Sequence, residues 1–409
     1  MLGKHLVFVS DLGHTGPIWP QILDGVADAG WRITIVSPKM SRAQKRFFYL
    51  NYSERRWQLI ETEDFRSPYR RFAGYPRILR RVLQFYAHLE VLKNSKKNKF
   101  ADPYSEWKDR ALQKLARIYL DEPFDFLLSS SSPFISHLIA REFSMSHKVK
   151  WVADYRDMWS LNHTLIEFDK YQVRFEQEIL SHATACTTTS EGFKKTLSQI
   201  FRGEILVIHN GFDMLFCERN FSSKTSWQIV YPGQIYEDLQ DIRPLLRVMK
   251  LLNEGKLNPI FTLLVTSYAV SHVKNVAREI GVLDTNWLQF GPVLPLKKSL
   301  ALQRRADLLL LLNCTNPKVE GWMQTKLYEY IASGIPFIAI GGGTYDESST
   351  LISDTKTGFV LRDETDILNF LQSFSKEGPP KLTRNLNKIM QLSRNEQGKK
   401  LAAFLDNLT

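Results

Sequence analysis

The segment His5-Leu6-Val7-Phe8-Val9-Ser10-Asp11-Leu12-Gly13-His14-Thr15-Gly16-Pro17 decides the fold class, because a short apolar run ends in a glycine-containing turn before a helical pattern. A strand, a turn and a helix in this order open a βαβ unit, and such units build parallel sheets. Glycines in the turn let the backbone approach a ligand, and the helix that follows offers free N–H groups to a phosphate or sugar. A tight turn without a ligand explains the same residues.

Apolar runs alternate with helical patterns along the rest of the chain, which indicates an α/β protein. Most of the runs are continuously apolar, as expected for strands that helices bury on both faces. In the first half we predict strands at His5–Ser10, Arg32–Val36, Phe126–Ser129, Lys150–Ala153, Ala183–Thr189 and Ile205–His209. The second series is Gln228–Tyr231, Phe261–Val265, Trp287–Phe290, Leu308–Leu312, Phe337–Ile340 and Gly358–Leu361.

The length of 409 residues predicts two domains, because single cores stop growing near ~250–300 residues. Residues 217–226 are polar and lack periodicity, so we place a linker there. The expected fold class is therefore α/β with two Rossmann-like domains that face each other across a cleft, residues 1–215 and 227–385. A final helix from Leu386 to about Leu408 is a candidate for crossing back onto the first domain.

Composition excludes several classes of protein. The chain is 44% hydrophobic and 24% charged, which is typical of a packed globular protein. Its three cysteines, Cys186, Cys217 and Cys314, are too widely spaced for a disulfide framework or a zinc knuckle. No signal-peptide pattern precedes the first strand, so we expect a cytoplasmic protein. The most apolar run, Ala306–Leu312, is far shorter than the ~20 residues that span a bilayer, so any membrane contact is expected to be peripheral.

The net charge of +11 is concentrated in one region. Residues 39–99 contain 16 Lys and Arg but 5 Asp and Glu, which accounts for the whole excess. A basic surface can meet nucleic acid, an anionic membrane or a phosphorylated substrate, and no nucleic-acid-binding module is recognisable. We hypothesise contact with an anionic membrane surface, with a core-facing helix as the alternative, because one helical stripe lies beside arginines: Ile78, Val82, Phe85, Leu89 and Leu92, with Arg77, Arg80 and Arg81.

The segment 151–159 places charged and aromatic residues at the end of an apolar strand. Asp154, Arg156 and Asp157 lie among tryptophan and tyrosine side chains. This density of polar groups indicates binding of sugar hydroxyls or phosphate between aromatic walls. The alternative is a salt-bridge network that fixes the loop.

The strongest candidate site is the segment 319–336. Lys326 and Glu329 are three residues apart on a predicted helix, so both point to one face near its N-terminal end. A lysine there can hold a diphosphate together with the helix dipole, and a carboxylate can accept two ribose hydroxyls. The alternative is a surface ion pair that contributes a few tenths of a kcal/mol.

Taken in order, several motifs make the chain resemble bacterial glycosyltransferases of family 4, whose fold is the two-domain glycosyltransferase-B type. The resemblance covers almost the whole chain, and the order and spacing of the motifs are more specific than any one of them. They are Asp102-Pro103-Tyr104 with Trp107 and Ala111, Asp154–Trp159, Thr189–Gly192, Asn210–Asp213, Tyr231–Gln234, Gln289–Val293, Ala306–Leu310 and Lys326–Pro336.

The resemblance implies that a sugar is transferred, with retention, from a nucleotide-diphosphate sugar to a saccharide or lipid-linked acceptor in glycan biosynthesis. It implies neither a cofactor nor a metal, and the sequence has no Asp-x-Asp triplet. The acceptor would bind the first domain and the donor mainly the second. By this resemblance Gly291, Pro292 and Val293 would lie beside the base, Glu329 would bind the ribose and Lys326 the diphosphate. The expected donor-binding residues are these with Gly16, Gln234, Arg243, Glu320 and Leu327. The expected acceptor-binding residues are Gly13, His14, Asp154, Arg156 and Asp157, and the catalytic candidates are Lys326, Asp157 and His14.

The sequence departs from the family pattern at two points. Many members have two glutamates eight positions apart, whereas here Gly321 is eight positions before Glu329 and Glu320 is one further. Many also have an Arg and a Lys after the first strand of the second domain, where this chain has Gln234 and later Arg243. These departures keep two alternatives open, a nucleotide-sugar epimerase on the same fold and a non-catalytic nucleotide-sugar-binding scaffold.

Overall fold

The computed structural model describes residues 4–408 except 16–17, 41–55, 63–75, 77–78, 80, 84, 87–88, 90–105, 163–168, 217–226, 258, 317–318 and 343–345. Two compact units make up the chain. The first contains residues 1–189, 193–209 and 394–409, and the second contains residues 190–192 and 210–393. The predicted linker, residues 217–226, lies outside the described residues.

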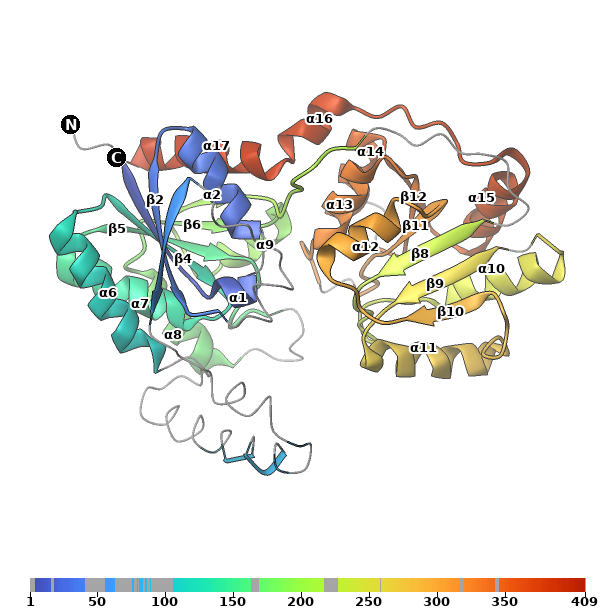
Figure 1. Cartoon of the computed structure of the whole chain (residues 1–409), viewed down its shortest axis with the longest axis horizontal. Helices are drawn as coiled ribbons and strands as arrows, with labels where there is room; N and C mark the ends of the chain where they lie inside the picture. The colour runs from blue at the N-terminus through green and yellow to red at the C-terminus, as the bar shows by residue number, and fades with distance from the viewer. Residues whose placement is uncertain are drawn as a thin grey trace. The chain divides into compact units, whose positions relative to one another are not determined.

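The first unit is built on a parallel sheet of seven strands in the order β3-β2-β1-β4-β5-β6-β7 (Figure 1). Strands β1 and β4 are buried throughout, which explains their continuous apolar sequence. The strands are β1 (His5–Val9), β2 (Arg32–Pro38), β3 (Trp57–Thr62), β4 (Phe126–Ser131), β5 (Lys150–Tyr155), β6 (Ala185–Thr188) and β7 (Glu204–Val207). The helices are α1 (Leu12–Thr15), α2 (Ile18–Asp28), α6 (Trp107–Asp121), α7 (Ile135–His147), α8 (Lys170–Leu180), α9 (Glu191–Leu197) and α17 (Arg394–Leu408).

Helices α2 and α17 pack side by side and complete one core of the first unit (Figure 1). Glycines allow this close contact, because a Cβ at Gly25 would collide with the backbone of Asn395 and one at Gly398 with the backbone of Ile22. The core beneath them combines apolar residues of both helices, such as Ile22 and Leu401, with alternate residues of the strands. The last helix of the chain is therefore part of the first unit.

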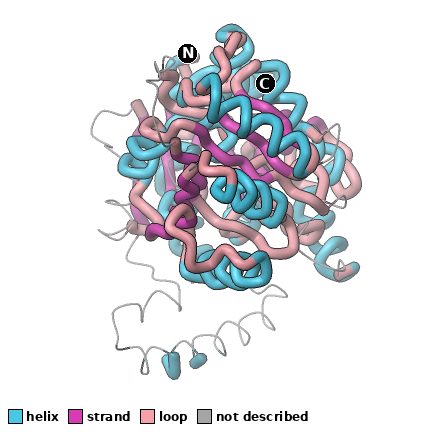
Figure 2. Tube along the Cα trace, turned by 90° about the vertical axis from the view of Figure 1, so that its right-hand side faces the viewer, coloured by secondary structure: helices cyan, strands magenta, loops and turns pink. Residues whose placement is uncertain are grey.

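The second unit is built on a parallel sheet of six strands in the order β10-β9-β8-β11-β12-β13. Strands lie inside and helices outside in the trace of the chain (Figure 2). The strands are β8 (Gln228–Pro232), β9 (Ile260–Leu264), β10 (Leu288–Gly291), β11 (Leu308–Leu312), β12 (Phe337–Ile340) and β13 (Gly358–Leu361). The helices are α10 (Arg243–Glu254), α11 (Ser267–Ile280), α12 (Leu296–Gln303), α13 (Thr325–Ser333), α14 (Glu347–Thr355), α15 (Glu364–Glu377) and α16 (Leu386–Gln391).

The five leucines of β11 show how this sheet is buried on both faces. Leu308, Leu310 and Leu312 join the core formed with α10, α11 and α15. Leu309 and Leu311 join the opposite core, formed with α13, α14 and α16. Because successive side chains of a strand point to opposite faces, an uninterrupted apolar run is what a doubly covered strand requires.

The predicted strands are all present, with small differences at their ends, and the predicted α/β class is confirmed. Strand β3 was not predicted. The single final helix was a wrong prediction, because Leu392 and Ser393 separate α16 from α17. Within the described residues, no helix is both long and apolar enough to cross a bilayer.

Candidate functional site

The carboxyl edge of the second sheet brings together the residues expected to bind the donor. Parallel strands β8, β11 and β12 end there at Pro232, Leu312 and Ile340. Helix α13 places Lys326 in its first turn and Glu329 one turn later. Open α/β sheets bind ligands at this edge, because backbone groups and side chains converge beyond the strand ends.

Lys326 is a buried cation. Its Nζ lies 3.8 Å from the centre of the Tyr231 ring, in a cation–π contact. The approach is close, since a Cβ at Gly233 would stand 3.0 Å from Nζ. The side chain as a whole is half-buried, but its ammonium is shielded and has no hydrogen-bond partner. Burial lowers the pKa of Lys326 from 10.5 to about 7, and the nearby charge of Glu329 offsets this only in part.

The N-terminus of α13 is open to an anion. Gln324 occupies the N-cap position, yet its side chain makes no capping hydrogen bond. Its Nε2 donates instead to the carbonyl of Leu312 at 2.6 Å, and its Oε1 accepts from Gln240 Nε2 at 3.2 Å. The first N–H groups of the helix therefore lack a side-chain cap, and the positive end of the helix dipole adds to the charge of Lys326.

This arrangement predicts that binding of a diphosphate takes up a proton. Between pH 7 and 10.5 the unfolded chain holds the Lys326 proton and the folded chain does not, so stability of the unliganded protein rises with pH across that window. A bound anion restores the charged form, so affinity for a nucleoside diphosphate should fall as pH rises above about 7. Calorimetric titrations near pH 7.5, in buffers of different ionisation enthalpy, measure the uptake directly.

The control for this prediction is Lys326→Arg, because a guanidinium stays protonated throughout the range. We expect the proton uptake to disappear in this variant. The same uptake in wild type and variant would show that another group titrates.

Asn313 is a candidate site residue that the sequence did not reveal. It follows β11 directly, is 3% exposed, and neither its Nδ2 nor its Oδ1 has a hydrogen-bond partner. Leaving a buried polar group unsatisfied costs about 1–3 kcal/mol. The only signal in the sequence is a polar residue immediately after five leucines.

The other residues expected at the donor site differ in their exposure and in their hydrogen bonds. Gly291 ends β10, and Pro292 and Val293 after it are exposed. The carboxamide of Gln234 accepts from Thr266 Oγ1 and donates to the Ile235 carbonyl at 3.1 Å.

Two further donor candidates lie at opposite extremes of exposure. Leu327 is fully buried in the core beneath α13, so its contribution is to packing. Glu320 is exposed ahead of the same helix.

Arg243 lies at the start of α10 and lines a different part of the surface from Lys326. Its Nε pairs with Asp241 at 2.8 Å. It lines a surface cleft of about 630 Å³ between α10, α11 and the start of α15. Among the described residues, the lining of this cleft includes neither Lys326 nor Glu329.

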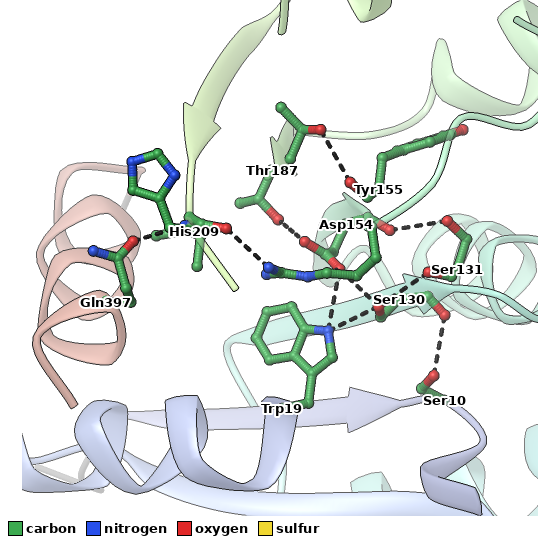
Figure 3. Close-up of polar contacts among 12 residues, drawn as sticks. Ser10, Trp19, Ser130, Ser131, Asp154, Tyr155, Thr187, His209 and Gln397 are labelled. Carbon is green, nitrogen blue, oxygen red and sulfur yellow. Dashed lines mark hydrogen bonds and ion pairs between the residues drawn. The ribbon is translucent and has the colours of Figure 1, made fainter. Parts of the chain in front are cut away.

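In the first unit, Asp154 is the centre of a buried hydrogen-bond network (Figure 3). Its carboxylate is fully buried. Oδ2 accepts from Ser130 Oγ at 2.6 Å, Trp19 Nε1 at 3.1 Å and Arg156 Nε at 3.1 Å. Oδ1 accepts from Thr187 Oγ1 at 2.7 Å. Four donors from separate segments saturate this carboxylate, so it ties strands and helix α2 together.

Arg156 completes the same network. Its Nη1 donates to the carbonyl of Ile208 at 2.8 Å, and its guanidinium lies 4.7 Å from the centre of the Trp19 ring. For Asp154 and Arg156 the geometry therefore supports the structural alternative, a salt bridge that fixes the loop, over direct contact with an acceptor.

The remaining acceptor-side candidates stay predictions. Asp157 is exposed at the end of β5. Gly13 is buried in α1, and its N–H donates to Asp11 Oδ1 at 2.8 Å. His14 is also in α1, but its side chain, like the whole of Gly16, lies outside the described part of the chain.

Two helix-covered parallel sheets, one with a cationic carboxyl edge, define the class as the glycosyltransferase-B fold. The chain superposes on sucrose-phosphate synthase from Thermosynechococcus elongatus with a TM-score of 0.63 and 12% identity, over 99% of both chains. A glycosyltransferase from Rickettsia africae gives 0.61 and 12%, over 100% of this chain and 99% of the other. Anabaena HepE in complex with UDP and glucose gives 0.57 and 12%, over 98% and 95%. No curated protein matches the sequence.

A family model matches the first half of the chain. Residues 16–211 match the model of the glycosyl transferase 4-like domain, so the chain contains this domain. Members of this family are sugar-transferring enzymes.

Proposed function

We propose that this protein transfers a sugar, with retention, from a nucleotide-diphosphate sugar to a saccharide or lipid-linked acceptor. The observation that carries the proposal is the buried ammonium of Lys326, which has no hydrogen-bond partner at the carboxyl edge of the second sheet. The oxygens of a diphosphate can accept its hydrogen bonds. The complex of HepE with UDP and glucose supports a nucleotide-sugar donor for this fold.

The chemistry assigned to Lys326 is stabilisation of the leaving group. When the bond between the anomeric carbon and the diphosphate oxygen breaks, negative charge grows on the diphosphate. A fixed cation and an uncapped helix N-terminus stabilise that charge without reorganising. The acceptor hydroxyl forms the new glycosidic bond and its proton passes to the departing phosphate. Asp157 and His14 are the alternative proton acceptors.

The rest of the donor is assigned to residues of α13 and to the end of β10. Glu329 is proposed to accept the ribose hydroxyls, and Gly291, Pro292 and Val293 at the end of β10 are proposed to lie beside the base. The protein is proposed to act in the cytoplasm.

Product analysis by mass spectrometry tests the proposal. A panel of nucleotide sugars is offered with and without saccharide and lipid-linked acceptors, and a glycosylated acceptor is the expected product. Conversion of the donor to an isomer without an acceptor would favour an epimerase. Donor binding without any turnover would favour a non-catalytic scaffold.

Glu329→Gln should raise the KM for the donor about 10-fold and change kcat much less. A hydrogen bond from a hydroxyl to a charged carboxylate is worth roughly 1.5–3 kcal/mol, and this contact is present in both ground and transition states. Steady-state kinetics at varied donor concentration measure the effect. The matched control is Glu254→Gln, an exposed residue on α10. A selective loss of kcat would contradict the ribose assignment.

We further propose that the region 39–99 contacts an anionic membrane surface. Its described residues include an exposed apolar helical face, with exposed fractions of 44–64%, formed by Leu79, Val82, Phe85, Tyr86 and Leu89. The stripe residues Ile78 and Leu92 and the arginines Arg77 and Arg80 lie outside the described residues. Exposed apolar side chains in a strongly basic segment fit the interface of an anionic bilayer.

Liposome sedimentation should therefore show binding to anionic vesicles but not to neutral ones. Phe85→Ser should weaken this binding, and high salt should abolish it, because charge attraction is screened. The control is Leu120→Ser, which removes an 83% exposed leucine from α6. Equal binding to neutral vesicles, or binding to neither kind, would exclude an electrostatic membrane contact.

A further inference from the structure

Asn313 is a buried residue whose side chain the fold leaves without a partner. Its backbone N–H donates to the Ile340 carbonyl at 2.8 Å, so the sheet fixes the residue at the end of β11. Its Nδ2 and Oδ1 are both buried and unpartnered. The neighbouring carboxamides of Gln240 and Gln324 do have partners, because both donate to the Leu312 carbonyl at 2.6 Å. Buried polar groups are normally satisfied, so an orphaned amide beside a binding edge points to a ligand.

The turn after β12 places two glycines close to Asn313. Gly341 and Gly342 have φ values of +83° and +88°. A Cβ at Gly342 would stand 2.6 Å from Asp346 Oδ2, 3.2 Å from the Cβ of Asn313 and 3.3 Å from its Nδ2. A larger residue at position 342 would crowd the amide, so the glycine turn preserves access to it.

The hydrogen-bonding character of an amide limits what can satisfy it. A carboxamide has two N–H donors and one carbonyl acceptor. Phosphate oxygens only accept, so a phosphate would leave Oδ1 unpaired. A hydroxyl both donates and accepts, and adjacent hydroxyls of a sugar can satisfy both ends of Asn313.

The order of the strands separates this position from the base and the diphosphate. Lys326 lies over Tyr231 on β8, and Asn313 ends β11, the next strand. Strand β10, where Gly291 is proposed to meet the base, lies on the other side of β8. Neighbouring strands are about 4.8 Å apart, so the strand order β10-β9-β8-β11 is consistent with the order base, diphosphate, sugar along the donor.

We infer that Asn313 binds hydroxyl groups of the transferred sugar and so recognises the sugar part of the donor. The inference rests on the proposed function, because it requires a nucleotide sugar at the carboxyl edge of the second sheet. Lys326 then holds the part of the donor that leaves, and Asn313 the part that is transferred.

Calorimetric titration of each variant with a nucleotide and with its sugar conjugate tests the inference. The probes are UDP, GDP, dTDP and ADP, each alone and as the glucose, mannose or N-acetylglucosamine conjugate. Asn313→Leu should weaken the best-bound conjugate about 10-fold and leave the matching nucleotide unchanged. The Tm of the unliganded variant should rise, because an unpaired buried amide is replaced by an apolar group of similar size. The control is Asn275→Leu, an exposed residue on α11, which should change neither affinity.

Asn313→Ala provides a second variant in case the leucine variant does not fold. It removes both polar groups of the amide without adding a charge, so it should weaken the conjugate and spare the nucleotide. An equal loss for nucleotide and conjugate, or no loss for either, would overturn the sugar contact while leaving the proposed function intact. If the wild-type protein binds no nucleotide sugar, the proposed function and this inference both fail.

Discussion

Lys326→Ala should lower kcat by about 100-fold or more and change the KM for the donor much less. The reason is that charge on the leaving diphosphate grows towards the transition state, so a fixed cation is worth more there than in the ground state. Single-turnover kinetics with a saturating donor separate this chemical step from product release.

The variant Lys326→Met serves as the folding control for this prediction. It has a similar volume and removes a buried ammonium that has no hydrogen-bond partner, so thermal unfolding of the unliganded protein should shift upward. If Lys326→Met is more stable and much less active than wild type, Lys326 acts in the reaction and is not needed for folding. If Lys326→Ala and Glu329→Gln both keep wild-type turnover and donor affinity, the proposed donor site is wrong.

Asp154→Ala should reduce the free energy of unfolding of the first unit by about 3–5 kcal/mol. Removing one partner of a buried ion pair leaves the Arg156 guanidinium without its counter-charge. Ser130 and Thr187 also lose the carboxylate that accepts from them, whereas Trp19 Nε1 keeps Ser130 Oγ as an acceptor at 2.8 Å. Denaturant unfolding followed by tryptophan fluorescence measures the loss.

Asp157→Ala is the matched control for the Asp154 prediction. Asp157 is three residues further along and exposed, so its removal should change stability by less than about 0.5 kcal/mol. If Asp154→Ala keeps wild-type stability but loses activity, a role of Asp154 in acceptor binding would be supported instead.

The strands were predictable because burial on both faces imposes an apolar run that local sequence displays, as in Leu308–Leu312. Strand β3 escaped prediction because it lies at the edge of its sheet, where its central residues Leu59 and Ile60 are only half-buried and polar residues interrupt the pattern. The break between α16 and α17 has a distant cause. Phe212 pairs with Ser393, and its N–H donates to the Leu392 carbonyl at 3.3 Å, which stops the helix.

The candidate site was predictable in its residues but not in its energetics. The spacing of Lys326 and Glu329 on α13 was readable from sequence. The burial of the ammonium was not, because Tyr231 and Gly233, which enclose it, come from a strand almost a hundred residues earlier. The orphaned amide of Asn313 likewise depends on the turn after β12, which only the folded sheet brings alongside.

The position of α17 in the first unit affects the order in which the chain can fold during synthesis. Leu401, Phe404 and Leu405 belong to the same core as Trp19 and Ile22, although nearly four hundred residues separate the two groups. Domains commonly fold as they leave the ribosome, N-terminal first. Here the unit that is synthesised first lacks part of its core until residues 394–409 emerge. The second unit, whose segments are contiguous apart from residues 190–192, can therefore be completed before it.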